Sequence, residues 1–343
     1  MKNTQQMDRP PCPAALSVVV PVYNSEASLR ELVTRLGPVL AGTGAPFELI
    51  LVNDGSRDGS GRVIEELTSR HEWVRGIHLV RNFGQHNALL CGIRDARHDV
   101  VVTMDDDLQN PPEEIPKLLE KLGEGVDVVY GTPETKQHGI FRNLASRITR
   151  VALQGSMEAE TARHASAFRA FRTCLRDAFA SYGSPFVSID VLLTWGTDRF
   201  AAVRVDHRPR RAGRSNYTLR KLVVHAFNMM TGFSTLPLQF ASLTGFVFTL
   251  FGIAVLAYVL GRYALEGGSV PGFPFLASVI AIFAGAQLFA LGIIGEYLAR
   301  MHFRMMEKPT YVSRREQQEH CKEKRWDVTL NQGFSARSMR KRS

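Results

Sequence analysis

The stretch that decides the fold is Asp99-Val-Val-Val-Thr-Met-Asp-Asp-Asp-Leu-Gln-Asn-Pro-Pro-Glu113. Its first half is a continuous apolar run, which is typical of a strand buried on both faces of a parallel sheet. Its second half places three consecutive carboxylates, Asp105, Asp106 and Asp107, where that strand ends. Ligands of open α/β sheets bind outside the carboxyl ends of the strands, so the acidic triplet marks a candidate site.

Alternate carboxylates of the triplet, Asp105 and Asp107, are spaced to hold one hard divalent cation, Mg²⁺ or Mn²⁺. Such a cation keeps coordination positions for substrate phosphates. A cation that bridges a diphosphate makes a nucleoside diphosphate a good leaving group. The alternative is a solvated acidic turn before a helix that Pro111 and Pro112 open. The rest of the chain favours the cation site.

The first two-thirds of the chain alternates strand and helix patterns. This alternation predicts an α/β domain with a mostly parallel, Rossmann-like sheet covered by helices on both faces. Three sets of candidate ligands follow predicted strands. They are Pro21, Tyr23 and Asn24 after the first strand, residues 53–56 after the second, and the acidic triplet after the fourth. The predicted strands are residues 16–23, 47–52, 76–80, 100–104 and 126–130, and the predicted helices are residues 26–40 and 85–96.

Two uncharged apolar stretches, residues 240–260 and 273–294, are each long enough to cross a bilayer as a helix. Two buried core helices of a soluble protein are the alternative. The connecting loop carries few charges, whereas basic residues flank both stretches on their outer sides. The positive-inside rule therefore predicts a multi-pass membrane protein with its N-terminal domain and both termini in the cytoplasm.

Net charge is concentrated at the C-terminus. The chain has a formal charge of +9, and residues 300–343 contain 12 Lys or Arg but only five Asp or Glu. This distribution argues against a nucleic-acid surface and predicts a basic cytoplasmic tail over residues 299–343, beside an anionic leaflet or solvated and disordered. The four cysteines show no zinc or CxxC spacing and suggest reduced thiols. The polar, Pro-rich residues 1–14 are expected to be disordered and are not a signal peptide.

Residues 217–238 have apolar side chains at helical spacing with basic residues between them. This pattern predicts an amphipathic helix at the membrane interface, although a core helix has a similar pattern. The predicted organisation is thus a catalytic domain over residues 15–216, the interface helix, two spans within residues 239–298, and the tail.

Four motifs together resemble glycosyltransferase family 2, within it the polyprenyl-phosphate glycosyltransferases. They are Val18-Val-Val-Pro-Val-Tyr-Asn24, Val52-Asn-Asp-Gly-Ser56, Arg81-Asn-Phe-Gly-Gln-His-Asn87 and Met104-Asp-Asp-Asp-Leu-Gln-Asn-Pro-Pro-Glu113. The resemblance runs from about residue 16 to residue 312, including Gly292-Ile-Ile-Gly-Glu-Tyr-Leu298. No single motif is decisive, but four in this order before two terminal spans form a specific combination.

The resemblance implies a GT-A fold that binds a nucleotide sugar. It implies that Pro21, Tyr23 and Glu26 line the nucleotide and that Asp54 bonds the base or ribose. Glu26 stands one place later than in the usual Tyr-Asn-Glu because Ser25 intervenes. Within the triplet, the resemblance implies that Asp106 faces the nucleotide or sugar. The implied Mg²⁺ or Mn²⁺ ligands are Asp105, Asp107 and Gln109.

A basic loop, Arg208-Pro-Arg-Arg-Ala-Gly-Arg-Ser-Asn-Tyr217, resembles the family's Arg-x-x-Gly-x-Ser-Lys-Tyr segment. Arginine forks suit phosphate oxygens, so the loop is expected to bind the donor diphosphate and the lipid phosphate; a membrane-surface basic patch is the alternative. Asn216 replaces the family's usual Lys. The candidate phosphate ligands here are Arg210, Arg211, Arg214 and Ser215.

A second departure concerns the acceptor. The family often has an Asp shortly before Phe-Arg, whereas this chain has no acid at residues 163–167. A phosphate acceptor is already anionic, so orientation and charge can suffice. His164 and Asp190, together with Asp106 and Asp107, are the candidate catalytic residues. Arg169 either contacts phosphate or anchors the fold.

The resemblance is greatest to the bacterial undecaprenyl branch and implies a protein of the bacterial inner membrane. It implies inverting transfer of a sugar, from a UDP-linked donor, to the phosphate of undecaprenyl phosphate, for cell-envelope glycosylation such as that of lipopolysaccharide. A processive polysaccharide synthase and a non-catalytic membrane adaptor are the alternatives. Arg325 and Trp326 lie in the tail with no span after them, unlike the synthase motif. The sugar has no readable signature, and a homo-oligomer is expected from family analogy alone.

Overall fold

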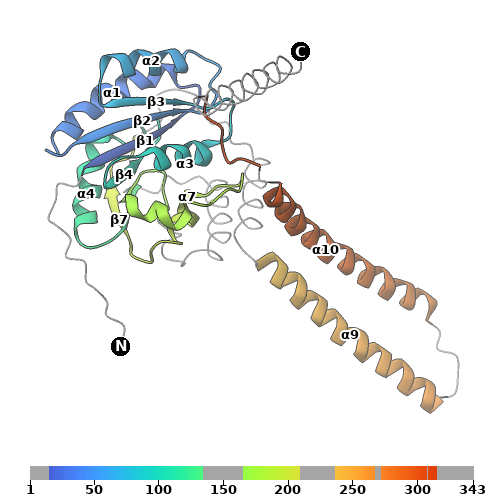
Figure 1. The fold of residues 1–343 in the computed structure, drawn as a ribbon. Coiled ribbons are helices and arrows are strands. Elements are labelled where there is room, and N and C mark those ends of the chain that lie inside the picture. Colours follow the sequence, from blue (N-terminus) through green and yellow to red (C-terminus); the bar gives the residue numbers. More distant parts are fainter. Residues whose placement is uncertain (1–14, 134–164, 209–235, 267–271, 307, 315–343) are drawn as a thin grey trace, which may run out of the picture. The chain divides into compact units, whose positions relative to one another are not determined.

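The computed structural model describes residues 15–133, 165–208, 236–266, 272–306 and 308–314. It contains two compact units. The sheet unit holds the described residues 15–133, 165–208 and 309–314, and the hairpin unit holds residues 236–306 and 308 without the gap at 267–271. Figure 1 shows the helices and strands of both units.

The sheet unit is built on seven strands in the order β3-β2-β1-β4-β6-β5-β7. β1, β2, β3 and β4 are parallel, β6 runs antiparallel to β4 and β5, and β7 is parallel to β5. The expectation of a mostly parallel α/β sheet with helices on both faces is therefore confirmed. The strands are β1 Leu16–Val22, β2 Phe47–Asn53, β3 Val74–His78, β4 Val100–Thr103, β5 Val128–Pro133, β6 Arg169–Arg172 and β7 Phe200–Val205.

The helices of the sheet unit are α1 Glu26–Ala41, α2 Ser60–Arg70, α3 Gln85–Asp95, η1 Pro112–Glu114, α4 Ile115–Gly123, η2 Thr173–Phe179 and α7 Ile189–Leu193. One core joins the apolar sides of α1, α2 and α4 to alternate strand residues such as Val18, Val20 and Val102. On the other face α3 lies close to β1 and β2, where a Cβ at Gly92 would come within 2.4 Å of Val19. Both faces of the central strands are covered, which explains their continuous apolar sequences.

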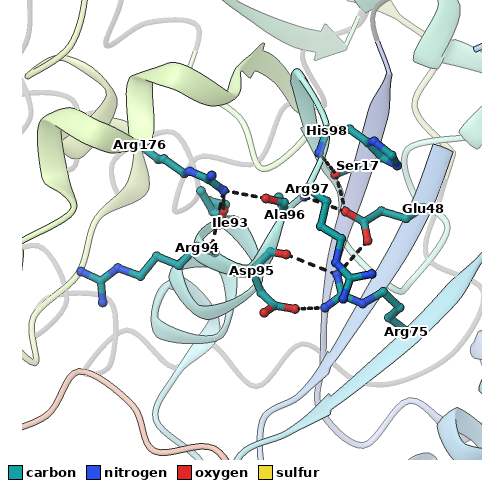
Figure 2. A network of polar contacts seen from close by, with 10 residues as sticks. All are labelled: Ser17, Glu48, Arg75, Ile93, Arg94, Asp95, Ala96, Arg97, His98 and Arg176. Atoms are coloured by element: carbon teal, nitrogen blue, oxygen red, sulfur yellow. Dashed lines mark hydrogen bonds and ion pairs between the residues drawn. The ribbon is translucent and has the colours of Figure 1, made fainter. Parts of the chain in front are cut away.

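A polar network closes the amino-terminal end of the sheet (Figure 2). Glu48 of β2 is 5% exposed. Its carboxylate accepts hydrogen bonds from Ser17 Oγ at 2.7 Å, Arg75 at 2.7 Å and the Arg97 backbone N–H at 2.8 Å. Arg75 also pairs with Asp95. Because every member is partnered, this network ties β1, β2 and β3 to the end of α3 without leaving a buried charge unpaired.

The hairpin unit consists of two long helices, α9 Leu236–Glu266 and α10 Phe273–Met305. Each contains one of the stretches predicted to be spans and extends beyond it. The helices touch through Phe248 and Phe283, whose ring centroids lie 5.5 Å apart. Their most apolar windows, Leu238–Val255 and Ile282–Ala299, are 6% and 0% buried, so neither is the covered core helix of a soluble domain. By length and composition both could cross a membrane.

The chain returns to the sheet unit after α10. Residues 309–314, which the sequence suggested were part of a basic tail, lie beside the end of β3, where Leu79 and Ser313 form an antiparallel bridge. The predicted interface helix lies almost entirely outside the described residues, as do residues 1–14 and the tail from residue 315.

Candidate active site

Three loops meet at the carboxyl edge of the sheet because β1 lies between β2 and β4. The loops after these strands carry residues 23–26, 54–59 and 104–111. Neighbouring parallel strands end at the same edge, so residues distant in sequence become adjacent there. The structure thus brings the candidate nucleotide residues and the acidic triplet to one edge, as the sequence predicts.

The acidic loop contains a residue in the left-handed backbone region, Leu108, with φ of 59°. Its side chain is only 5% exposed and belongs to the main core. Asp107 Oδ1 accepts a 3.1 Å hydrogen bond from the Gln109 backbone N–H. A non-glycine residue in this region costs about 1–2 kcal/mol, so burial of Leu108 holds the triplet in a conformation that the backbone alone disfavours.

Gln85 is a site residue that sequence reasoning did not single out. It is the first residue of α3, and its Nε2 donates a 2.7 Å hydrogen bond to Asp105 Oδ1. Its position in the Arg81–Asn87 motif was the available signal. Asp105, Asp106 and Asp107 are all half-buried, and each has polar or charged neighbours.

The donor chemistry of the acidic loop fits a hard cation that is shared with a substrate. Among the described residues, no group of three His, Cys, Asp or Glu could hold a metal ion. Mg²⁺ and Mn²⁺ sites of nucleotide enzymes commonly use only one or two carboxylates and take phosphates and water as the other ligands. Asp105 and Asp107 are carboxylates of the kind that such sites use, and the ligand roles of Asp105, Asp107 and Gln109 all stay predictions.

The loop after β1 is held to the loop after β2 by reciprocal hydrogen bonds. Asn24, in the left-handed region with φ of 54°, accepts from the Arg57 N–H at 2.8 Å and donates its own N–H to Ser56 Oγ at 3.1 Å. Pro21 lies within buried β1, and Tyr23 is 43% exposed beside it. The exposed tyrosine ring is therefore available to a ligand at this edge.

The Glu26 carboxylate binds a backbone N–H group of the protein itself. Its Oε2 accepts the Gly59 backbone N–H at 3.0 Å, just before α2 begins. A Cβ at position 59 would lie 2.3 Å from the Glu26 carboxylate. The carboxylate that the resemblance assigns to the nucleotide therefore fixes the start of α2, and any ligand contact would have to share it.

Asp54 is likewise bound by backbone. It is 2% exposed, and its two carboxylate oxygens accept the N–H groups of Phe83 at 2.7 Å and Gly84 at 2.9 Å. Burial raises the pKa of Asp54 above its ordinary value, and the two N–H groups and the Arg81 charge oppose that rise. The next residue, Gly55, has φ of +66°, and a Cβ there would meet the backbone of Arg81 and Asn82 at 2.4–2.8 Å. Asp54 and Gly55 together hold residues 79–84 against the end of β2. We call residues 79–84 the donor loop because two of its backbone N–H groups donate hydrogen bonds to Asp54.

Arg169 and Asp190 form an ion pair with each other. Arg169 is 1% exposed, between Thr103 of β4 and Tyr130 of β5 in the sheet register. Burial raises the pKa of the Tyr130 hydroxyl well above its ordinary value, and the nearby Asp190 charge raises it further. Of the two roles considered for Arg169, the geometry favours that of an anchor, since the guanidinium lies inside the fold.

The first turn of α3 carries further residues that the sequence did not single out. His86 Nδ1 accepts the Ile189 backbone N–H at 3.4 Å, and Asn87 Nδ2 donates to the carbonyls of Phe83 at 3.0 Å and Pro185 at 3.2 Å. These bonds dock the segment that leads into α7, and with it Asp190, onto α3. His164 and the phosphate candidates Arg210, Arg211, Arg214 and Ser215 lie outside the described residues.

The chain that leads into the basic loop lies next to the acidic loop. The Arg208 backbone N–H donates a 2.8 Å hydrogen bond to the Gln109 carbonyl. His207 Nδ1 lies 3.4 Å from Asn110 Oδ1. The segment that leads into the arginine-rich loop is therefore hydrogen-bonded to the acidic loop at Gln109, two residues after Asp107.

The chain is similar in sequence to known sugar transferases. The family "Glycosyl transferase family 2" matches residues 17–182. An undecaprenyl-phosphate 4-deoxy-4-formamido-L-arabinose transferase of Pseudomonas paraeruginosa is 36% identical over 88% of this chain and 89% of its own length. A protein with the same name from Shewanella sediminis is 36% identical over 91% and 93%.

Solved structures are more distant. Glucosyl-3-phosphoglycerate synthase of Mycobacterium tuberculosis, in complex with Mn²⁺ and UDP-glucose, is 23% identical over 64% of this chain and 77% of that chain, with a TM-score of 0.47. The identity and coverage of the curated relatives are high enough to establish kinship without these structures. The chain belongs to glycosyl transferase family 2 and is a glycosyltransferase.

Proposed function

We propose that this glycosyltransferase moves a sugar from a UDP-linked donor to the phosphate of a membrane polyprenyl phosphate, undecaprenyl phosphate. The names of the relatives support this class of acceptor. The structural observation that carries the proposal is the junction of the acidic loop with the start of the basic loop, through Gln109 and Arg208.

The donor binds at the edge where the loops after β1, β2 and β4 meet. Tyr23 offers an exposed ring to the nucleotide, and Pro21 shapes the end of β1 beneath it. Asp54 acts on the nucleotide through the donor loop, because both of its oxygens hold backbone N–H groups of that loop. Asp106 faces the nucleotide or the sugar.

Asp105 and Asp107 would hold Mg²⁺ or Mn²⁺, with Gln109 as an additional oxygen donor. When bound, this cation neutralises charge on the diphosphate leaving group. Gln85 fixes the rotamer of Asp105 through its 2.7 Å hydrogen bond. Arg210, Arg211, Arg214 and Ser215 supply further positive charge and hydrogen bonds to phosphate oxygens.

The acceptor is an anionic phosphate, so its oxygen attacks the anomeric carbon without removal of a proton by a strong base. Attack from the face opposite the departing nucleotide inverts the anomeric configuration. The apolar helices α9 and α10, both long enough to cross a membrane, keep the enzyme in the layer where a polyprenyl chain dissolves. His164 stays a candidate for orienting the acceptor.

The deciding experiment is a transfer assay with the detergent-purified protein. Undecaprenyl phosphate and Mg²⁺ or Mn²⁺ are mixed with a panel of UDP- and GDP-sugars, and the lipid fraction is analysed by mass spectrometry. We expect a sugar-phospholipid from one UDP-sugar, with inverted configuration by NMR. A product from a GDP-sugar, or a retained configuration, would correct the donor or the mechanism. Release of free sugar with no lipid product would reject the acceptor.

A matched pair of variants tests the acidic loop. Asp107 follows the carboxyl end of β4, and the exposed Asp99 immediately precedes the amino end of the same strand. Asp107→Asn is expected to lower kcat at least 100-fold, on the scale of losing one group that stabilises transition-state charge. Asp99→Asn makes the same change in charge and should leave activity near that of the wild type. Equal activities would remove Asp107 from the site.

A further inference from the structure

Residues 310–313, which we call the return segment, bring the chain from α10 back into the sheet unit. Leu79 and Ser313 form an antiparallel bridge, and the Val80 N–H donates a 3.1 Å hydrogen bond to the Val312 carbonyl. Thr310 and Ser313 are 6% and 7% exposed. Two of the four residues are thus buried, Tyr311 and Val312 are half-buried, and Figure 1 shows the segment in dark red beside the end of β3.

Tyr311 ties the return segment to α3. The Arg94 guanidinium carbon lies 5.9 Å from the centre of the Tyr311 ring. Arg94 also donates hydrogen bonds to the carbonyls of Ala180 at 3.0 Å and Tyr182 at 2.7 Å. These bonds to the segment after η2 fix the position of the Arg94 guanidinium. The cation–π contact therefore rests on an anchored cation rather than on a mobile surface side chain.

The donor loop is held between two partners. On one side Asp54 binds the N–H groups of Phe83 and Gly84, and the Leu79 N–H donates to the Asn53 carbonyl at 2.9 Å. On the other side Leu79 and Val80 pair with the return segment. A displacement of the return segment would therefore act on the same loop whose amides Asp54 holds.

We propose that the return segment is part of the nucleotide side of the active site, with Tyr311 as a positioning residue that acts through the donor loop. This inference rests on the proposed function for its nucleotide. It assigns the residues after α10 to donor binding, whereas the sequence assigns them to a basic tail. The return segment, which follows the second apolar helix, thereby keeps the donor loop in the conformation that binding of the nucleotide sugar requires.

The first test detects the contact between the return segment and Leu79 without an activity assay. In a background with the native cysteines replaced, Leu79→Cys and Ser313→Cys are combined in the full chain within membranes. Opposed residues of an antiparallel pair have Cα atoms about 4.5–5.5 Å apart, a separation that suits a disulfide. Mild oxidation should therefore link them. The control pairs Ser313→Cys with Glu124→Cys, in the turn between α4 and β5, five strands from β3. Equal or absent linkage in the two pairs would overturn the docking.

The second test measures the consequence for the donor loop. Tyr311→Ala is expected to speed hydrogen exchange of residues 79–84 and to raise the Kd for UDP in the presence of Mg²⁺ or Mn²⁺ several-fold. In the transfer assay it should raise the donor KM and leave kcat nearly unchanged. Tyr311→Phe keeps the ring and should restore all of these values. Unchanged exchange in residues 79–84 would reject the positioning role.

The two proposals fail separately. If the wild type forms no sugar lipid, yet the 79–313 disulfide forms and Tyr311→Ala loosens the donor loop, the transfer reaction is wrong and the return segment stands. If transfer proceeds and Tyr311→Ala changes neither exchange nor donor KM, the return segment is structural only.

Discussion

Single residues at the carboxyl edge combine ligand chemistry with unusual backbone geometry. Among the described residues, the only non-glycine positions with positive φ are Asn24 and Leu108, and both belong to the candidate site. Such conformations persist where the surrounding structure compensates for them. At Leu108 the compensation is burial, and at Asn24 it is the pair of hydrogen bonds to residues 56 and 57.

Gly55 offers a test at this scale. Gly55→Ala and Gly44→Ala each place an alanine at positive φ, which costs about 1–2 kcal/mol in both. Only at position 55 does the new Cβ strike backbone, that of Arg81 and Asn82, whereas position 44 is open. Overpacking adds about 1–3 kcal/mol. We expect Gly55→Ala to lower Tm further and to weaken UDP binding. Equal effects from the two variants, measured by thermal unfolding and calorimetry, would contradict this close approach.

The hydrogen bonds of individual site residues could be predicted from the sequence only in part. The motif order predicted that Asp54, Glu26 and the acidic triplet gather at one edge, because strand ends of a parallel sheet coincide. It did not reveal that Asp54 and Glu26 already bind backbone N–H groups of Phe83, Gly84 and Gly59. Those partners lie about 30 residues away in the sequence, and such hydrogen bonds depend on loop conformations that no local pattern encodes.

Among the elements, the polar network at the amino-terminal end of β1, β2 and β3 stabilises the sheet at the edge opposite the site. Desolvation of Glu48 tends to raise its pKa, but hydrogen bonds from Arg75, Ser17 and the Arg97 N–H outweigh it and lower the pKa below 4.5. A lowered folded-state pKa means that the stabilisation is present above pH 4.5 and is lost as pH falls through the folded value.

Glu48→Gln should therefore lower stability at neutral pH by about 2 kcal/mol, the scale of a hydrogen bond to a charged group. Between pH 5 and pH 3 the Tm of the wild type should fall more steeply than that of the variant, so that the two curves converge. Glu72→Gln, at an exposed position before β3, is the control and should follow the wild type. Parallel curves for Glu48→Gln and the wild type would show that the network does not hold the Glu48 charge.

The ion pair between β6 and α7 can be separated into structure and chemistry by a double substitution. Arg169→Met leaves Asp190 unpaired and should cost about 3–5 kcal/mol, while Arg169→Met with Asp190→Leu should recover most of that loss. Tm reports the recovery. If stability returns and transfer activity does not, the pair contributes to the reaction; if both return, it is an anchor only.

The whole molecule joins a sheet unit to an apolar hairpin. The apolar faces of α9 and α10 are exposed, and such an area is unstable in water. We expect the protein to stay in the membrane fraction after extraction with alkaline carbonate and to require detergent for solubility. Its appearance in the carbonate supernatant would contradict membrane insertion.

At this scale the sequence predicted the βα alternation and the apolar helices, since both follow from hydrophobic periodicity. It did not predict β6 or β7 and therefore missed the antiparallel direction of β6, because the short segment Arg169–Arg172 has no pattern that marks a strand or its direction. It also missed the return of residues 309–314 to the sheet, since that pairing depends on backbone groups rather than on an apolar motif.

The return of the chain after α10 has a consequence for dissection of the enzyme. The sheet unit contains polypeptide from both sides of the hairpin, so no single scission yields an intact sheet unit free of α9 and α10. A cut between residues 209 and 235 would leave an N-terminal fragment whose last docking piece, residues 310–313, resides on the other fragment. The two halves would then behave as a complementation pair, which recovers donor binding only when they reassociate.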